Sequence, residues 1–139
     1  NMSKEVSKAM INQGSGGKIL FNVSKQAVNP GKNFGAYGLP KATLMFLLKQ
    51  LALELGEHKI SVNGVNADKI RSGLLTPEMI ENRSKSRGLN ESDYMKGNLL
   101  SEEVKAIHVA EGFLALAKTE RTSAHILTID GGNIEASLR

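Results

Sequence analysis

A long apolar helix followed closely by a strand is predicted by residues 36–65, which read AYGLPKATLMFLLKQLALELGEHKISVNGV. Residues 36–56 carry leucines at helical spacing, and Gly56 is a natural helix stop. The leucines of this stripe are Leu44, Leu47, Leu48, Leu51 and Leu55. Pro40 is compatible with the helix because it falls in the first turn, where backbone N–H groups have no helical partner. Residues 60–65 alternate apolar and polar side chains, so this stretch indicates an α/β protein.

Helices and strands continue to alternate on both sides of this unit. Further helices are predicted at residues 2–12, 77–85, 91–96 and 102–118, and further strands at 18–23 and 125–129. In the helix at 102–118, the side chains expected to point inward are Val109, Ala110, Phe113, Leu114 and Ala117. The order α-β-α-β-α-β predicts a parallel sheet with right-handed crossovers.

The composition is that of a globular protein with one hydrophobic core. The chain has 139 residues, of which 40% are hydrophobic and 23% charged, and it contains no cysteine. Because cysteine is absent, the sequence offers no disulfide or thiolate chemistry, which fits a reducing compartment, and we expect a cytoplasmic location. No apolar run approaches the roughly 20 residues that a membrane span needs, so we expect no membrane partner.

The charge pattern argues against nucleic-acid binding, and the spacing of the histidines argues against metal binding. The net charge is +4, the cations are spread along the chain, and aromatic residues make up only 4% of it. Arg83, Lys85 and Arg87 form the one local basic cluster, which we interpret as a polar helix face rather than an anion site. The three histidines have no metal-ligand spacing, so no metal is expected.

Tyr37 and Lys41 lie four residues apart at the start of the long helix, so both side chains are expected on one face. A free phenol is a poor base at neutral pH, but a nearby ammonium favours its charged form. Such a pair can exchange a proton with an alcohol or a carbonyl oxygen. By itself the spacing is weak evidence, and a surface helix start with a tyrosine packed nearby would be the preferred interpretation.

Ser24 gives this pair a chemical context. It follows the first predicted strand and precedes Tyr37 by thirteen residues. The carboxyl ends of parallel strands are where α/β sheets bind ligands, and a serine there can hydrogen-bond a substrate oxygen. The alternative interpretation of Ser24 is a turn residue that closes a strand.

Together these elements resemble the short-chain dehydrogenase/reductase family. The order is Ser24, then Tyr-x-x-x-Lys, a long apolar helix, Ile60-Ser-Val-Asn-Gly-Val-Asn66 and a final Asp130-Gly-Gly132. A narrower similarity, to the dehydrogenase part of bifunctional class II aldolase/short-chain dehydrogenases of the rhamnulose-phosphate aldolase fusion type, rests on further motifs. These are Val28-Asn-Pro-Gly31, Asn33-Phe-Gly-Ala-Tyr-Gly38, Leu51-Ala-Leu-Glu-Leu-Gly56, Val62-Asn-Gly-Val-Asn66, Asn98-Leu-Leu100 and Asp130-Gly-Gly-Asn133.

The resemblance implies a role for each site residue. Tyr37 would be the general acid/base, Lys41 would support it and bind the nicotinamide ribose, and Ser24 would orient the substrate oxygen. Ile70 would meet the nicotinamide amide through its backbone, and Ser72 would replace the threonine usual in the family. Two residues, Ala67 and Asp68, stand where the family usually has Pro-Gly, and Asp68 brings a carboxylate near the expected cofactor.

The resemblance also implies what the chain lacks. Residues 1–139 would form the C-terminal half of a Rossmann-like doubly wound sheet, without the N-terminal half that carries the glycine-rich cofactor turn. The parent would be an NAD- or NADP-dependent oxidoreductase that interconverts a small alcohol and a carbonyl compound by a Ser-Tyr-Lys mechanism. We expect this chain alone to be inactive and to hold no cofactor.

Two further expectations complete the prediction. The alternative to an enzyme fragment is a non-catalytic domain that keeps the fold for binding or assembly. Because the helix at 36–56 is apolar on more than one side, and because the resembling family pairs this helix with a partner subunit, we expect a homodimer or homotetramer.

Overall fold

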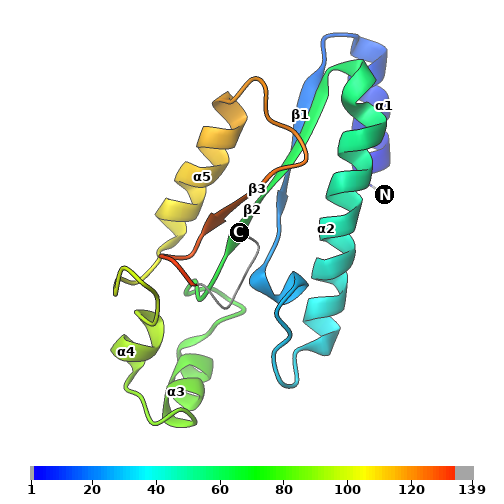
Figure 1. The fold of residues 1–139 in the computed structure, drawn as a ribbon. Coiled ribbons are helices and arrows are strands. Elements are labelled where there is room, and N and C mark those ends of the chain that lie inside the picture. The colour runs from blue at the N-terminus through cyan, green and yellow to red at the C-terminus, as the bar shows by residue number, and fades with distance from the viewer. Residues whose placement is uncertain (1, 134–139) are drawn as a thin grey trace.

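The computed structural model describes residues 2–133 and contains a three-stranded parallel sheet (Figure 1). The strands are β1 (Gly17–Asn22), β2 (Ile60–Ala67) and β3 (Ile126–Ile129). They lie in the order β1-β2-β3, and both neighbouring pairs are parallel. The predicted α/β class and parallel sheet are therefore confirmed.

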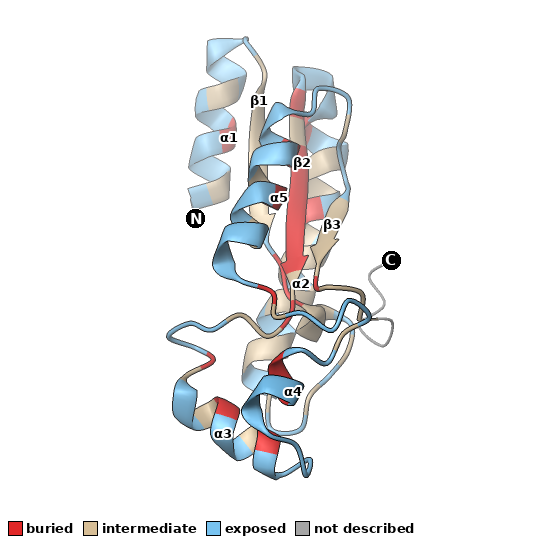
Figure 2. Cartoon of the chain, turned by 90° about the vertical axis from the view of Figure 1, so that its left-hand side faces the viewer, coloured by how far each residue is buried: buried red, intermediate tan, exposed pale blue. Residues whose placement is uncertain are grey.

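Helices cover both faces of this sheet. α2 (Gly35–Leu55) lies on the same face as α1 (Met2–Gln13), and α5 (Ala106–Lys118) lies on the opposite face (Figures 1 and 2). Two short helices, α3 (Pro77–Lys85) and α4 (Glu91–Met95), lie beyond the carboxyl ends of the strands. The single-turn helices η1 (Lys25–Ala27) and η2 (Gly56–His58) follow β1 and α2.

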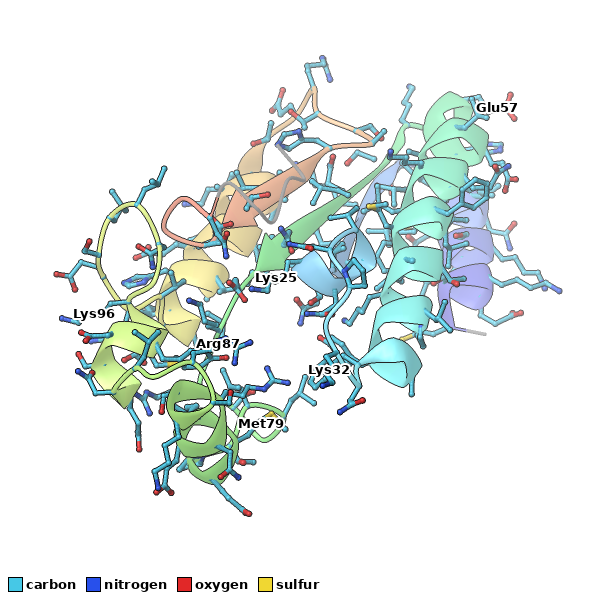
Figure 3. The ribbon with its side chains drawn as sticks, turned by 60° about the horizontal axis from the view of Figure 1, so that its bottom comes forward. Lys25, Lys32, Glu57, Met79, Arg87 and Lys96 are labelled. Atoms are coloured by element: carbon cyan, nitrogen blue, oxygen red, sulfur yellow. The ribbon has the colours of Figure 1, made fainter. Side chains whose placement is uncertain are left out.

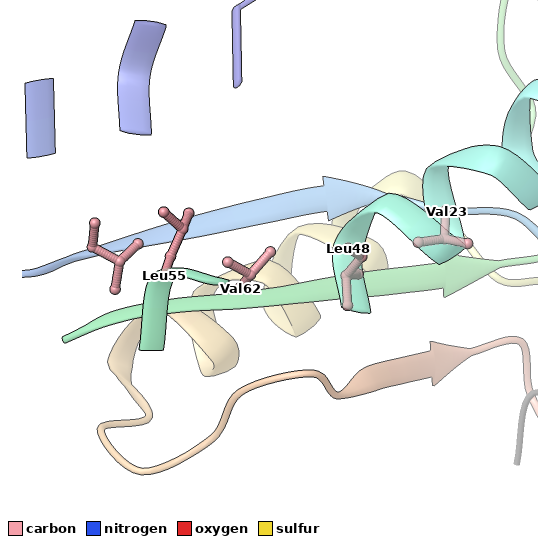
Figure 4. Close-up of a cluster of buried hydrophobic side chains, with 5 residues drawn as sticks. Val23, Leu48, Leu55 and Val62 are labelled. Carbon is pink, nitrogen blue, oxygen red and sulfur yellow. The ribbon is translucent and has the colours of Figure 1, made fainter. Parts of the chain in front are cut away.

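The main hydrophobic core lies between α2 and the central strand, which is the most buried element in Figure 2. Its fully covered side chains are Val23, Leu48, Leu55, Ile60 and Val62 (Figure 4). Burying one such side chain contributes about 1.5–3 kcal/mol. Gly64 makes the contact close, because a Cβ there would lie 2.7 Å from Leu48 Cδ1. Three leucines of the predicted stripe, Leu48, Leu51 and Leu55, therefore face the sheet, whereas Leu44 and Leu47 lie outside this core cluster.

α2 also carries apolar side chains that nothing in the described chain covers. Leu39, Phe46 and Leu53 are 72%, 68% and 79% exposed. They recur every seven residues, so they share one face of the helix. Met45 and Ala52, which are not part of the leucine stripe, pack against the main core.

The start of α5 differs from the prediction by four residues. We expected a helix from residue 102, but α5 begins at Ala106. Asn98 explains the delay, because its Nδ2 donates to the carbonyl oxygen of Glu102 at 2.7 Å and its Oδ1 accepts from the Leu100 N–H at 3.1 Å. These bonds hold a turn in which Ser101 has a φ of 54°, a left-handed conformation that a right-handed helix cannot include.

The inward face of α5 also differs from the prediction. Gly112 and Leu116 are its buried residues, whereas Leu114, which we expected inside, is 54% exposed. Val109 and Phe113 are partly buried, and Ala110 and Ala117 are exposed. The reason is the close approach of β3, since a Cβ on Gly112 would lie 3.0 Å from Ile129 Cγ1. Gly112, which has no side chain, therefore lies at the contact with β3 that the apolar periodicity did not predict.

A second, smaller core holds the segment of residues 76–97, which contains α3 and α4. Thr76 Oγ1 caps α3 by accepting from the Met79 N–H, and Asn90 Oδ1 caps α4 by accepting from the Asp93 N–H. The buried side chains of this core are Leu75, Ile80, Tyr94 and Met95. Across residues 2–133, no helix is both long enough and apolar enough to cross a membrane.

Candidate functional site

An open cleft of about 1430 Å³ lies where β1 and β2 end and where the segment of residues 76–97 faces the start of α2. Figure 3 looks toward this region, with Lys25 on η1, Lys32 before α2 and Arg87 after α3 on its different sides. The predicted residues Ser24, Tyr37, Ile70 and Ser72 all line this cleft. Lys41 is not part of its wall.

Ser24 is held by the turn that follows β1. Its side chain is 8% exposed, and its Oγ accepts a hydrogen bond from the Gln26 N–H at 3.3 Å as the N-cap of η1. The Val23 N–H donates to the Val65 carbonyl at 2.8 Å, so the sheet extends up to the serine. Ser24 is thus the turn residue that follows a strand, and it also lines the cleft.

Tyr37 and Lys41 share the first turns of α2. The Lys41 Nζ lies 5.7 Å from the centroid of the Tyr37 ring and donates to the Asn22 carbonyl oxygen at 2.7 Å. The ring of Phe34 meets Tyr37 edge-on at 5.6 Å, with an interplanar angle of 68°. Lys41 therefore positions the start of α2 against the end of β1, and its ammonium lies beside the phenol ring.

The loop after β2 contributes Ile70 and Ser72 to the cleft. Ser72 Oγ accepts from the N–H groups of Leu74 and Leu75 at 3.3 and 3.2 Å. Its own N–H donates to the Leu75 carbonyl at 3.3 Å. These bonds close a compact turn and fix the direction in which the loop leaves the sheet.

A partly buried ion pair at the cleft joins η1, which follows β1, to the loop after β2. The Lys25 Nζ lies 2.6 Å from Asp68 Oδ2, with side chains 24% and 6% exposed, and Asn133 Nδ2 donates to the same oxygen at 2.9 Å. We expected Asp68 to bring a carboxylate to the cofactor region. Asp68 does line the cleft, but its carboxylate already forms an ion pair with Lys25 and accepts a hydrogen bond from Asn133.

Strand register explains why these two residues meet. Gly17 lies opposite Ile60 and Asn22 lies opposite Val65, and Lys25 and Asp68 have the same offset of 43 residues. The pair therefore continues the register of the parallel strands beyond the ladder. The predicted strands at 18–23 and 60–65, aligned end to end, are offset by 42 residues and would set Lys25 opposite Ala67, so the sequence did not locate this pair.

Lys69, the next residue, ties the cleft to the segment of residues 76–97. Its Nζ donates to the carbonyl oxygens of Tyr94 and Gly97 at 2.9 and 3.1 Å, and it lies 5.3 Å from the Tyr94 ring centroid. Burial lowers the pKa of Lys69 below its usual value; Asp68 opposes this shift, and the charges of Lys25 and Arg87 add to it. Lys69 is therefore surrounded by charges of both signs, since Asp130 also opposes the shift.

The basic cluster at residues 83–87 is divided by the fold. Lys85 faces outward and pairs with Glu81 at 2.6 Å, as expected for a polar helix face. Arg83 and Arg87 instead line the cleft. In the part of the chain that the structure describes, no group of three or more His, Asp or Glu side chains could hold a metal ion.

The fold and the position of the site define a class of protein. A parallel sheet with helices on both faces and a cleft at the carboxyl ends of its strands is a Rossmann-like α/β protein. A family model described as enoyl-(acyl carrier protein) reductase matches residues 1–133, and proteins of Arabidopsis thaliana named short-chain dehydrogenase reductase are 30% identical over 93–96% of this chain. The chain belongs to the short-chain dehydrogenase/reductase family.

Known proteins support this assignment. The uncharacterized oxidoreductase YuxG of Bacillus subtilis (strain 168) is 33% identical over 139 residues, which are 94% of this chain and 20% of that protein. The L-xylulose reductase of Mesocricetus auratus is 32% identical over 140 residues, 94% of this chain and 52% of the reductase. The crystal structure of acetoin dehydrogenase from Enterobacter cloacae has a TM-score of 0.76 and 25% identity, covering 99% of this chain and 50% of that one. The chain thus spans about half of two of these relatives and a fifth of the third.

Proposed function

We propose that the chain is the catalytic C-terminal half of an NAD- or NADP-dependent oxidoreductase that interconverts a small alcohol and a carbonyl compound. One observation carries the proposal: Ser24 and Tyr37 line one cleft, and Lys41 lies against the Tyr37 ring while bonded to Asn22 in the cleft wall. The aldolase-fusion type of parent remains the narrower form of this proposal, and the match to only 20% of YuxG is compatible with a multidomain parent.

The donor groups fit the nicotinamide end of a dinucleotide. The Lys41 ammonium has three protons and makes one hydrogen bond among the described residues, so two remain for ribose hydroxyls. Ile70 and Ser72 line the neighbouring wall, where the amide would bind. The phosphates have no comparable cradle within residues 2–133: Gly14 and Gly16, which have positive φ, lie between a helix and a strand, the reverse of the order that places a helix N-terminus on a phosphate.

In this mechanism the residues of the chain transfer the proton and orient the substrate. A bound nicotinamide would give or accept the hydride. Ser24 would hydrogen-bond the substrate oxygen. Tyr37 would donate its hydroxyl proton to a carbonyl oxygen in the reduction, and as the phenolate would accept the hydroxyl proton of an alcohol in the oxidation. Lys41 would favour the charged form of the phenol through its nearby ammonium.

The alternative is a domain that keeps this fold for binding or assembly without catalysis. The observation that favours it is Ala67-Asp68 in place of Pro-Gly. The Lys25–Asp68 ion pair weakens that argument, because it neutralises the carboxylate. Screening the complete polypeptide for hydride transfer to NAD and NADP, across small hydroxy and carbonyl compounds, separates the two functions.

The decisive experiment replaces Tyr37 by phenylalanine in the complete polypeptide. The hydroxyl carries the proton while the ring still packs against Phe34, so we expect kcat/KM to fall by about 10²–10⁴ with the fold retained. Lys41→Met should also lower the rate. Lys49→Met, an exposed lysine further along the same helix, is the matched control and should leave the rate unchanged. Near-normal turnover of Tyr37→Phe would rule out the proposed acid/base.

The same proposal includes self-association. Leu39, Phe46 and Leu53 form an exposed apolar stripe on α2, and Val6 on the neighbouring α1 is 37% exposed. Apolar patches of this kind are usually covered by another surface. We therefore propose a symmetric homodimer, or a homotetramer built from it, with the α2 helices at its centre.

A further inference from the structure

Positive charge is concentrated in the cleft. The described residues that line it include six cations and two carboxylates, whereas the whole chain has 18 cations and 14 acids. The cations are Lys25, Lys32, Lys69, Arg83, Arg87 and Lys96, and the acids are Asp68 and Asp93. The cleft therefore differs in charge from the rest of the surface.

Most of this positive charge is not matched by a protein carboxylate. Asp68 forms an ion pair with Lys25 at 2.6 Å, and Asp93 accepts a hydrogen bond from Asn90 Nδ2 at 2.8 Å. Within the described chain, neither Arg83 nor Arg87 has a carboxylate oxygen within 4.0 Å.

Both guanidinium groups are nevertheless held in place. Arg83 lies 4.5 Å over the Phe34 ring, and Arg87 lies 5.4 Å over the Tyr94 ring. Cation–π contacts of this kind fix the plane of a guanidinium while leaving its N–H groups at the edge. Because Phe34 also touches Tyr37, a single aromatic ring separates Arg83 from the proposed acid/base.

A purely structural role accounts for only part of this arrangement. Arg87 Nη1 donates to the Arg83 carbonyl at 3.0 Å and to Ser86 Oγ at 3.4 Å, which caps the end of α3. That role uses one nitrogen of the three. The Nε and Nη2 groups of Arg87, and the whole guanidinium of Arg83, make no hydrogen bond to the described residues, and a guanidinium edge matches two oxygens of an anion.

We propose that Arg83 and Arg87 bind an anionic group of the substrate, a carboxylate or a phosphate ester, at the end of the cleft away from the sheet. This inference rests on the proposed oxidoreductase function and narrows its substrate class to small hydroxy or carbonyl compounds that carry a negative charge.

The test compares two probes that differ in one phosphate. D-glyceraldehyde 3-phosphate and D-glyceraldehyde are titrated into the chain at constant ionic strength, and binding is followed by NMR shifts of the tyrosine rings, of which the chain has only two. We expect the phosphorylated probe to bind at least about tenfold more tightly, because two charge-assisted hydrogen bonds are available to it. Equal affinity for the two probes would overturn the inference.

Variants assign the effect to the arginines. The double variant Arg83→Gln/Arg87→Gln should abolish the preference for the phosphorylated probe. Arg87→Lys should reduce the preference, because a lysine keeps the positive charge but cannot donate two parallel hydrogen bonds as a guanidinium does. Arg121→Gln removes an exposed arginine outside the cleft and should change nothing. Thermal unfolding of each variant checks its fold, and Arg87→Lys remains informative if the double variant unfolds. A preference that survives Arg83→Gln/Arg87→Gln in a folded protein contradicts the proposal.

A final arm separates the two sources of phosphate. If these arginines serve the phosphates of a dinucleotide, NADH binding to the complete polypeptide will weaken in Arg83→Gln/Arg87→Gln, and D-glyceraldehyde 3-phosphate will compete with NADH; that result also overturns the proposal. The readouts are binding affinities, so they do not depend on turnover. If the chain shows no preference for the phosphorylated probe and the Tyr37→Phe enzyme is inactive, only the anion site is refuted. If the Tyr37→Phe enzyme keeps its activity, the proposed mechanism is refuted.

Discussion

Replacing Lys25 by methionine removes the cation from a carboxylate that has almost no contact with solvent. The two side chains meet at 2.6 Å, and that of Asp68 is 6% exposed. Breaking a buried pair by removing one partner costs about 3–5 kcal/mol. Lys25 is 24% exposed and Asn133 still donates to Asp68, so we expect a loss of about 2–3 kcal/mol in the free energy of unfolding.

Thermal and urea unfolding of the chain measure this loss. For a chain of this length, 1 kcal/mol corresponds to roughly 3–4 °C in Tm, so Lys25→Met should melt about 6–12 °C below the parent protein. Asp68→Asn should cost less, about 1 kcal/mol, because it leaves a partly exposed lysine that water can solvate. Lys25→Met/Asp68→Asn should recover much of the loss, since no uncompensated charge remains.

A surface ion pair provides the matched control. Lys8 lies 3.3 Å from Glu5, but these side chains are 58% and 65% exposed. Lys8→Met should therefore change stability by less than about 0.5 kcal/mol. If Lys25→Met behaves like Lys8→Met, or if the effects of Lys25→Met and Asp68→Asn simply add, the strand ends are not held together by this pair and the reasoning is wrong.

The remaining predictions concern the core, the exposed stripe and the cofactor. Leu48→Ala should cost about 2–5 kcal/mol in chemical unfolding, because the side chain is fully buried against β2. Gly64→Ala should cost about 1–3 kcal/mol, since its methyl group would lie 2.7 Å from Leu48 Cδ1 and 2.9 Å from Val23 Cγ2; a neutral effect would show that the contact relaxes freely. Light scattering should report at least twice the subunit mass of 15.0 kDa, and Phe46→Glu/Leu53→Glu should shift it toward one subunit; a wild-type monomer at tens of micromolar would refute self-association. Calorimetry with NAD and NADP should show very weak binding to this chain and no turnover, whereas micromolar binding with turnover would contradict the missing phosphate cradle.

Apolar periodicity predicted the elements that depend on one continuous face. The leucines of α2 repeat at helical spacing and the helix packs along β2, so its position followed from sequence. The start of α5 did not, because it depends on side-chain hydrogen bonds from Asn98 within a turn. The inward face of α5 was also wrong, because Gly112 marks a close approach to β3 and contributes nothing to a hydrophobic pattern.

The candidate site divides in a similar way. Ser24 and Tyr37 could be predicted because strand ends and helix starts are visible in the sequence, and the structure brings both to one cleft. The pairing of Lys25 with Asp68 needs the register of two strands, which local pattern does not give. The turn of Arg83 toward the cleft, with Lys85 pointing outward, depends on how α3 packs on its own small core.

Asp68 and Lys69 together show how the loop after β2 can depart from the family pattern and still be stably held. A carboxylate at position 68 would disfavour a buried strand end, but the register of the parallel strands sets Lys25 opposite it. Lys69 has a φ of 49°, a conformation that costs a residue with a side chain about 1–2 kcal/mol. Its Nζ offsets that cost with bonds to the Tyr94 and Gly97 carbonyls. The two residues therefore bind this loop to η1 on one side and to the segment of residues 76–97 on the other.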